Sequence, residues 1–560
     1  MKNFISRNKY IILTILILVS IMCYFITQKN GFHEDEIFSY GSSNYKYDNV
    51  YRWYGYAEAD QDILYNQVLQ GNLKEKISNI TKYIKDNSSF QKDENLSKEI
   101  PIFRTKEEAK SYLVIEKNDI FNYFSVYYNQ ARDVHPPLFY FLVHFISSLF
   151  YGIFSKYIIF ILNLIFFVSS LFIIKKIMKE LKHDELTIPA MILYGASIGC
   201  ISTVMFQRMY MMMTFFGLCY LCLTLKLIND NFEIKKKRWW IITILLGFLT
   251  QYYFCVYIAI IFMLISIYLL LNKQFKKWFK YLRVHIIPAI SGIIFYPFSI
   301  EDIFFSYRGL GGTNEHTKTI MENINYYFTQ IYELFGFKNI LIFIIAILMF
   351  ILIFKLIKRN LQKISKEQLY KMLILIIPIF IYILIMSKIS PFLGEKYTSR
   401  YIMILFPTIA ISIIYMSTFI FNKNTLLVTL LFSIILSING FINNTPTYLY
   451  KDNKQVMELA KANSDKYFVY VFDNYFTHLS SMPEFATYKE SIILNNTIHD
   501  FDILNNDKLR NSNEFILCIK NWLNQEEVLN KVLTSTGYTD YEVLLSLNTD
   551  VEATYYKISK

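Results

Sequence analysis

The sequence predicts an α-helical, polytopic membrane protein that carries a small α/β domain at its C-terminal end. Hydrophobic residues make up 54% of the 560 positions and charged residues only 18%, and the mean hydropathy is +0.29. A single soluble core of this length does not need so much apolar sequence. The apolar residues also fall in runs long enough to cross a bilayer, whereas the region after residue 443 is polar and carries short strand-like segments.

Runs of about 20 apolar residues predict about eleven membrane spans. They are residues 10–27, 157–174, 187–206, 209–227, 239–252, 254–272, 284–300, 338–356, 371–387, 401–420 and 425–441. The first run follows three basic residues and has no small-residue cleavage site after it, so we expect a retained signal anchor.

One further apolar segment, Leu138 to Tyr151, decides the topology, because counting it as a span would invert every later loop. If it lies along the membrane surface instead, the Lys and Arg clusters at 175–182, 235–238 and 273–283 share one side. Cytoplasmic loops carry such an excess of basic residues. We therefore predict a juxtamembrane helix here, and a multi-pass protein of the cell membrane whose first loop and C-terminal region are extracytoplasmic.

The predicted domains follow from this topology. Residues 1–442 form the transmembrane domain, which includes a first external loop at 28–155 with a helical segment around Asp62 to Ile84. Residues 443–560 form the extracytoplasmic α/β domain. We expect its strands at 467–472, 492–494, 515–519 and 542–547, and helices at 454–462 and 525–533.

The net charge of +12 does not indicate nucleic acid, because the basic residues cluster between apolar runs. Titratable residues instead gather at the predicted outer ends of the spans. Glu34, Asp35 and Glu36 follow the first span, and Asp133-Val134-His135-Pro136-Pro137 ends the first loop. Carboxylates at the mouth of a membrane domain are costly to desolvate, and they commonly do chemistry or bind a charged group. The alternatives are a solvated loop start for the triplet and a helix start capped by Asp133 for the second motif.

The two motifs resemble the protein O-mannosyltransferases, whose first external loop opens with an Asp-Glu pair and ends in His-Pro-Pro-Leu. Two further segments, Gln207 to Tyr210 and Lys396 to Tyr401, resemble the lipid A aminoarabinose transferases, in which an Arg beside a Tyr recurs at helix ends. The resemblance implies a GT-C fold of the glycosyltransferase 39 superfamily. It also implies transfer of a hexose or pentose from a polyprenyl-phosphate donor to a cell-surface or outer-leaflet glycan, lipid or protein.

Transfer to a hydroxyl needs a carboxylate base, and we assign that role to Asp35, with Glu36 orienting the acceptor or sharing the charge. Glu34 and Asp133 are expected to support the site. The departing phosphate needs charge stabilisation, for which Arg is suited. The predicted phosphate-binding residues are His135, Arg208, Tyr210, Lys396, Arg400 and Tyr401. For the Arg-Tyr pairs, interfacial anchoring of helix ends is the alternative.

Two departures from the resemblance limit what it implies. Leu138 is followed by Phe139-Tyr140 where the mannosyltransferases continue with Gly-Lys, so mannose and a protein acceptor do not carry over. Gln207-Arg208-Met209 lacks the Asp of the aminoarabinose transferases, so we expect no metal ion, a divalent cation being doubtful, and no other cofactor.

Two other classes of function remain. An envelope polysaccharide ligase or polymerase would be expected to place its key Arg and His in a long late loop, whereas the longest loop here comes first. A flippase would need polar groups at the membrane midplane, and no charged residue lies in the middle of a predicted span. A scaffold of envelope assembly is the remaining alternative.

Overall fold

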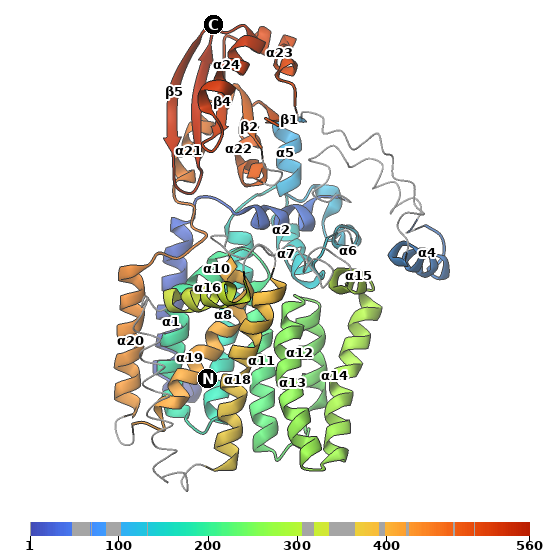
Figure 1. Ribbon diagram of the computed structural model, residues 1–560, viewed down its shortest axis with the longest axis vertical. Helices are drawn as coiled ribbons and strands as arrows, with labels where there is room; N and C mark the ends of the chain where they lie inside the picture. Colours follow the sequence, from blue (N-terminus) through green and yellow to red (C-terminus); the bar gives the residue numbers. More distant parts are fainter. Residues whose placement is uncertain are drawn as a thin grey trace. The chain divides into compact units, whose positions relative to one another are not determined.

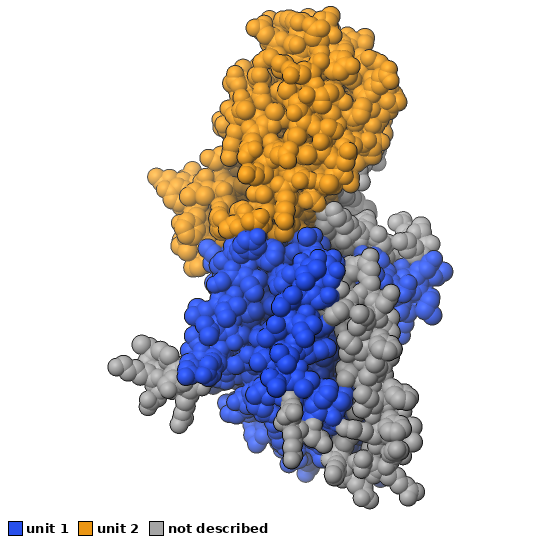
Figure 2. Space-filling model, turned by 90° about the vertical axis from the view of Figure 1, so that its left-hand side faces the viewer, with its two compact units in different colours: residues 1–26, 134–139, 159–447 blue, residues 27–133, 140–158, 448–560 orange. Residues whose placement is uncertain are grey.

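The computed structural model describes residues 2–46, 68, 70–85, 102–131, 133–304, 319–334, 365–390, 398–421, 425–473, 477–497 and 499–560. The chain forms two compact units (Figure 2). Unit 1 comprises residues 1–26, 134–139 and 159–447, and unit 2 comprises residues 27–133, 140–158 and 448–560.

Unit 1 is a bundle of apolar helices (Figure 1). Its helices are α1 (Lys2–Gln28), α8 (Tyr157–Glu180), α9 (Thr187–Gly195), α10 (Ile198–Met205), α11 (Tyr210–Asn229), α12 (Lys237–Phe248), α13 (Tyr253–Leu271), α14 (Phe275–Phe295), α15 (Ser299–Phe304), α16 (Ile320–Leu334), α18 (Lys366–Ile389), α19 (Phe406–Ser417) and α20 (Thr425–Asn443). Two 3₁₀ segments, η6 (Asp184–Leu186) and η9 (Thr398–Leu405), precede α9 and α19.

Among the described residues, seven helices are long and apolar enough to cross a membrane, or eight if one bent pair counts as a span. The bent pair joins η6 and α9 to α10 at 62°. It breaks where Ser197 accepts a hydrogen bond from the Cys200 backbone N–H and so starts a new helix. The predicted span at 338–356 lies outside the described residues, and α12 has only 12 residues. The polytopic helical architecture is confirmed, and the count of eleven stays a prediction.

Unit 2 combines short helices with one sheet. Its helices are α2 (Glu34–Asn44), α4 (Leu73–Lys85), α5 (Lys106–Leu113), α6 (Tyr123–Gln130), α7 (Leu138–Leu149), α21 (Asn453–Ala462), α22 (Met482–Phe485), α23 (Asp507–Arg510) and α24 (Gln525–Thr536), with 3₁₀ segments η5 (Lys117–Asp119), η10 (Thr477–Ser481) and η11 (Phe501–Leu504). Its strands are β1 (Ile102–Thr105), β2 (Tyr467–Phe472), β3 (Glu490–Asn495), β4 (Glu514–Lys520), β5 (Asp540–Leu547) and β6 (Ala553–Ser559).

The sheet has the order β1-β3-β2-β4-β6-β5, in which β3, β2 and β4 run parallel and the outer strands antiparallel. Alternate residues of β2 face opposite sides. Val469 and Val471 pack in the core with α24 and η11, whereas Phe468 and Tyr470 contact Phe485 of α22. The parallel strands are therefore covered on both faces, which explains their nearly continuous apolar sequences.

The four strands and two helices predicted after residue 443 are confirmed within a few residues at each end. Two strands were missed. β6 completes the C-terminal part, and β1 comes from the first loop, where Phe103 pairs with Ile492 of β3. The compact units consequently differ from the predicted domains, because most of the first loop clusters with residues 448–560 rather than with the membrane helices.

The segment after His135 forms a short helix. α7 has 12 residues, which at 1.5 Å per residue is roughly 18 Å, against about 30 Å for a bilayer core. Its length therefore agrees with the predicted juxtamembrane helix.

Candidate functional site

The acidic triplet forms the first turn of α2 in unit 2. His33 is the N-cap residue, and its ring Nδ1 accepts a hydrogen bond from the Asp35 backbone N–H at 3.0 Å. Glu36 completes the capping box by accepting the His33 backbone N–H at 2.7 Å. Carboxylates in a first turn also suit the positive end of the helix dipole. Local sequence therefore fixes where this helix begins and how its acidic residues point.

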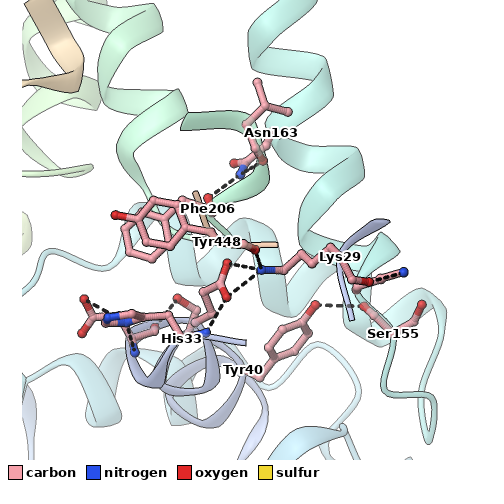
Figure 3. Close-up of polar contacts among 12 residues, drawn as sticks. Lys29, His33, Tyr40, Ser155, Asn163, Phe206 and Tyr448 are labelled. Carbon is pink, nitrogen blue, oxygen red and sulfur yellow. Dashed lines mark hydrogen bonds and ion pairs between the residues drawn. The ribbon is translucent and has the colours of Figure 1, made fainter. Parts of the chain in front are cut away.

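Glu36 makes a buried ion pair with Lys29 (Figure 3). The Lys29 ammonium donates to both Glu36 carboxylate oxygens at 2.9 Å and to the Tyr448 carbonyl at 2.6 Å, and both side chains are fully buried. Burial lowers the pKa of Lys29, against the opposing effect of Glu36. Hydrogen bonds to every charged atom offset the cost of burying such a pair. Glu36 thus holds the start of α2 in place.

Asp35 differs from its neighbour. Its side chain is 13% exposed, and its Oδ2 lies 3.8 Å from Nδ1 of His33. The Asp35 side chain therefore keeps a small exposed area, on a helix whose start is fixed by Glu36 and Lys29.

The far end of α2 is also held by hydrogen bonds within unit 2. Tyr40 donates its hydroxyl to the Ser155 carbonyl at 2.8 Å (Figure 3). Asn129 of α6 donates to the Ser42 carbonyl at 3.2 Å, and His144 of α7 lies 2.6 Å from the Ser43 carbonyl. Both ends of the helix are fixed, so Asp35 is carried on a preorganised element.

Arg208 and His135 come together in unit 1. Their Nη2 and Nε2 atoms lie 3.5 Å apart, and the residues are only 2% and 6% exposed. The turn that carries Arg208 between α10 and α11 is held by Asn163, which donates to the Val204 and Phe206 carbonyls at 3.0 and 2.9 Å (Figure 3). Arg208 is therefore buried beside His135, on a turn held by two hydrogen bonds.

The second Arg-Tyr pair lies in η9 of the same unit. Arg400 donates to the Tyr401 hydroxyl at 3.3 Å, and its guanidinium lies 5.2 Å from that ring centroid. Tyr382 of α18 donates to the Tyr401 carbonyl at 2.9 Å, and the Tyr210 ring stacks on Phe206. α11, which begins at Tyr210, packs against η9, so the two Arg-Tyr segments lie on neighbouring elements. Lys396 lies outside the described residues.

Asp133 belongs to unit 2, where its backbone N–H donates to the Gln130 carbonyl at 3.0 Å. The helix after the double proline starts at Leu138, and the Leu138 backbone N–H donates to the Leu249 carbonyl at 3.0 Å. The Leu249 carbonyl thus holds the first residue of this helix.

Sequence reasoning missed three residues of these clusters. Lys29 and His33 had a local signal, because both precede the acidic triplet. Lys29 is a cation seven residues before Glu36, and His33 is a possible N-cap three residues before it. Tyr382 had none, since only the packing of α18 brings it to Tyr401. The part of the chain that the structure describes contains no group of three or more His, Cys, Asp or Glu side chains able to hold a metal ion. Metal independence stays a prediction.

Comparison with known proteins finds similarity in structure and none in sequence. No family model matches the chain, and no curated protein matches it by sequence. The crystal structure of ArnT from Cupriavidus metallidurans bound to undecaprenyl phosphate superposes with a TM-score of 0.52 at 8% identity, covering 98% of each chain.

Two further structures are more distantly similar. The apo state of the same ArnT gives a TM-score of 0.41 at 9% identity, over 75% of this chain and 87% of that one. The Archaeoglobus fulgidus oligosaccharyltransferase, in complex with Zn and sulfate, gives 0.37 at 12% identity, over 73% and 63%. The ArnT superposition over nearly the whole length of both chains carries the conclusion: this chain is a polytopic helical membrane protein with the GT-C fold that its sequence motifs predict.

Proposed function

We propose that this chain is a membrane glycosyltransferase that takes a monosaccharide from a polyprenyl-phosphate donor. The observation that carries the proposal is the buried Arg208 beside His135 in a chain with the ArnT fold. Buried basic side chains on a rigid turn suit a phosphate group, because charge-assisted bonds are strongest away from water. Undecaprenyl phosphate bound to that ArnT supports a donor of the same chemistry here.

The reaction is a single displacement at the anomeric carbon. An acceptor hydroxyl attacks that carbon, the bond to the phosphate oxygen breaks, and the polyprenyl phosphate leaves with the electron pair. Asp35 takes the acceptor proton as the new bond forms. Attack opposite the leaving group inverts the anomeric configuration.

The leaving phosphate is stabilised by Arg208 and Arg400, whose planar guanidinium groups can each bind two phosphate oxygens. His135, Tyr210, Tyr401 and Lys396 complete the proposed donor site. Glu36 acts on the acceptor only through the position of Asp35, since both its oxygens bind Lys29. Glu34 and Asp133 retain a supporting role, which for Asp133 is to fix His135 or its loop.

The acceptor is a glycan, lipid or protein of the outer leaflet or cell surface, and the acidic turn and the sheet domain are extracytoplasmic. Cysteine labelling checks the orientation. A label at Asn453 should react from outside the cell and one at Lys236 only from inside, and the reverse pattern would overturn the extracytoplasmic site.

The decisive test uses donor chemistry. A deletion strain should accumulate a polyprenyl-phosphate sugar, and the purified chain should consume that lipid in the presence of acceptor, with EDTA present throughout because no metal is required. Accumulation of a lipid-linked oligosaccharide instead would favour a polysaccharide ligase or polymerase. Translocation of the lipid without release of its sugar would favour a flippase. If the lipid is neither consumed nor translocated, a scaffold of envelope assembly is favoured.

A further inference from the structure

The sheet of unit 2 has a feature that the transfer reaction does not use. β2 and β4 are neighbouring parallel strands, and the connections that follow them cover opposite faces. Phe485 of α22, after β2, packs on Phe468 and Tyr470, whereas Val528 of α24, after β4, lies in the core cluster of the other face. In open α/β sheets, ligands bind at the carboxyl ends of strands where the connections diverge in this way.

An aromatic platform lies at that point. Trp522, two residues beyond β4, is 45% exposed. Its indole N–H donates to Oδ1 of Asp473, which follows β2, at 2.5 Å. The Lys520 ammonium lies 5.6 Å from the Trp522 ring centroid and donates to the Val551 carbonyl at 2.9 Å. The ring is thus fixed from both strands while a large part of its surface stays open.

The groups around the ring are polar, and the Lys520 ammonium and the Asp473 carboxylate carry opposite charges. Asn521, the residue before Trp522, donates to the Leu547 carbonyl and to the side chain of the exposed Asn548. The first turn of α24 carries Glu526 and Glu527, which oppose an anion at that helix N-terminus. A phosphate or nucleotide is therefore disfavoured. A ligand with an apolar C–H face and many hydroxyls suits the ring, the Asp473 carboxylate and the amides.

The carboxyl ends of β2 and β4 lie on the side of the sheet nearest α2, within the same unit (Figure 1). Lys29 interacts electrostatically with Asp550 in the β5–β6 turn, and η10 packs on α2. The platform and the acidic turn consequently occupy the same end of unit 2. We propose that Trp522, with Asp473 and Asn548, is a carbohydrate-binding site that holds a sugar residue of a glycan acceptor chain.

This proposal rests on the proposed function, since it specifies a glycan as the acceptor, but glycan binding and sugar transfer are measured separately. The full chain in lipid nanodiscs is titrated on an array of neutral and N-acetylated oligosaccharides, without donor. Binding should weaken at least about tenfold in Trp522→Ala, since a central Trp commonly dominates binding energy. Trp522→Phe, which keeps a ring and loses the N–H bond to Asp473, should be intermediate.

The matched control is Tyr541→Ala, which removes another aromatic side chain, 54% exposed on β5, and should leave binding unchanged. Wild-type protein that binds none of the sugars, or equal binding by Trp522→Ala and wild type, would overturn the proposal. Brominated lipids supply a second readout. Stronger quenching of wild-type fluorescence than of Trp522→Phe fluorescence would show that Trp522 anchors the domain in the bilayer, which would also overturn it.

Discussion

The first turn of α2 and the Arg208 turn both bury charge, but they do so in opposite ways. In unit 2, Lys29 and Glu36 neutralise each other through hydrogen bonds to both carboxylate oxygens. In unit 1, the Arg208 turn brings two basic side chains within 3.5 Å of each other. The difference teaches that a buried ion pair fixes the position of a helix, whereas a buried Arg beside a His suits an anionic ligand.

The largest expected effect is on the rate of sugar transfer, and it distinguishes the role of Asp35 from that of Glu36. Asp35→Asn keeps the shape and removes the base, so transfer should fall by roughly 10² to 10⁴-fold, measured as donor consumed per minute. Glu36→Gln keeps an acceptor for the His33 N–H, and its main effect should be a lower stability of α2. A larger loss of kcat in Glu36→Gln than in Asp35→Asn would mean that Glu36 is the base and that Asp35 has the positioning role.

The ion pair itself can be broken from one side. Lys29→Met leaves Glu36 buried without its cation and should cost about 3 to 5 kcal/mol of local stability, read from hydrogen exchange of the α2 amides. The double variant Lys29→Met/Glu36→Gln removes both charges and should recover most of the loss. Equal losses in the single and double variants would show that the Lys29 chain, and not its charge, supports the helix.

The basic turn is tested by ligand affinity. Arg208→Gln and Arg400→Gln should each weaken binding of undecaprenyl phosphate roughly tenfold or more, because a charge-assisted contact contributes about 1.5 to 3 kcal/mol. The Lys variants keep the charge without the planar fork and should be intermediate. Unchanged affinity in both Gln variants would mean that these residues anchor helix ends at the membrane interface.

A third buried charge gives the smallest effect and depends on pH. Glu484 in the sheet region accepts the Tyr555 hydroxyl at 2.9 Å, and burial raises its pKa above the usual 4.5. The unfolded chain loses this proton first, so stability falls as the pH rises from about 4.5 through the folded-state pKa.

Glu484→Gln should therefore protect the β3 and β4 amides from hydrogen exchange at neutral pH and make no difference below pH 4.5. The exposed Glu458→Gln on α21 is the control. A variant less protected than wild type at neutral pH would show that the ionised carboxylate stabilises the fold.

Most of the fold could be predicted because each element carries its own signal. Long apolar runs identified α8, α11 and α13, and short apolar runs identified β2 and β4. β1 could not be identified, because its four residues are a strand only through pairing with β3. The number of spans could not be predicted from the sequence either, since α9 and α10 share one apolar run that bends at Ser197.

The candidate site was predictable residue by residue but not in its arrangement. Motifs pointed to Asp35, Arg208 and Arg400 because charge at the end of an apolar run is unusual. Spacing along the chain could not show that His135 lies against Arg208, or that Glu36 forms an ion pair with Lys29. Such contacts depend on packing, which brings distant segments together.

The pairing of β1 with β3 has a consequence for biogenesis. β1 ends at Thr105 and β3 begins at Glu490, so almost all the membrane helices lie between them in the chain. A ribosome makes the first strand long before its partner, and contacts so distant in sequence form late. The nascent first loop must therefore wait, with an open strand edge, until the last helix has been inserted. During that interval a chaperone or protease at the membrane surface would meet a segment that the finished protein pairs with β3.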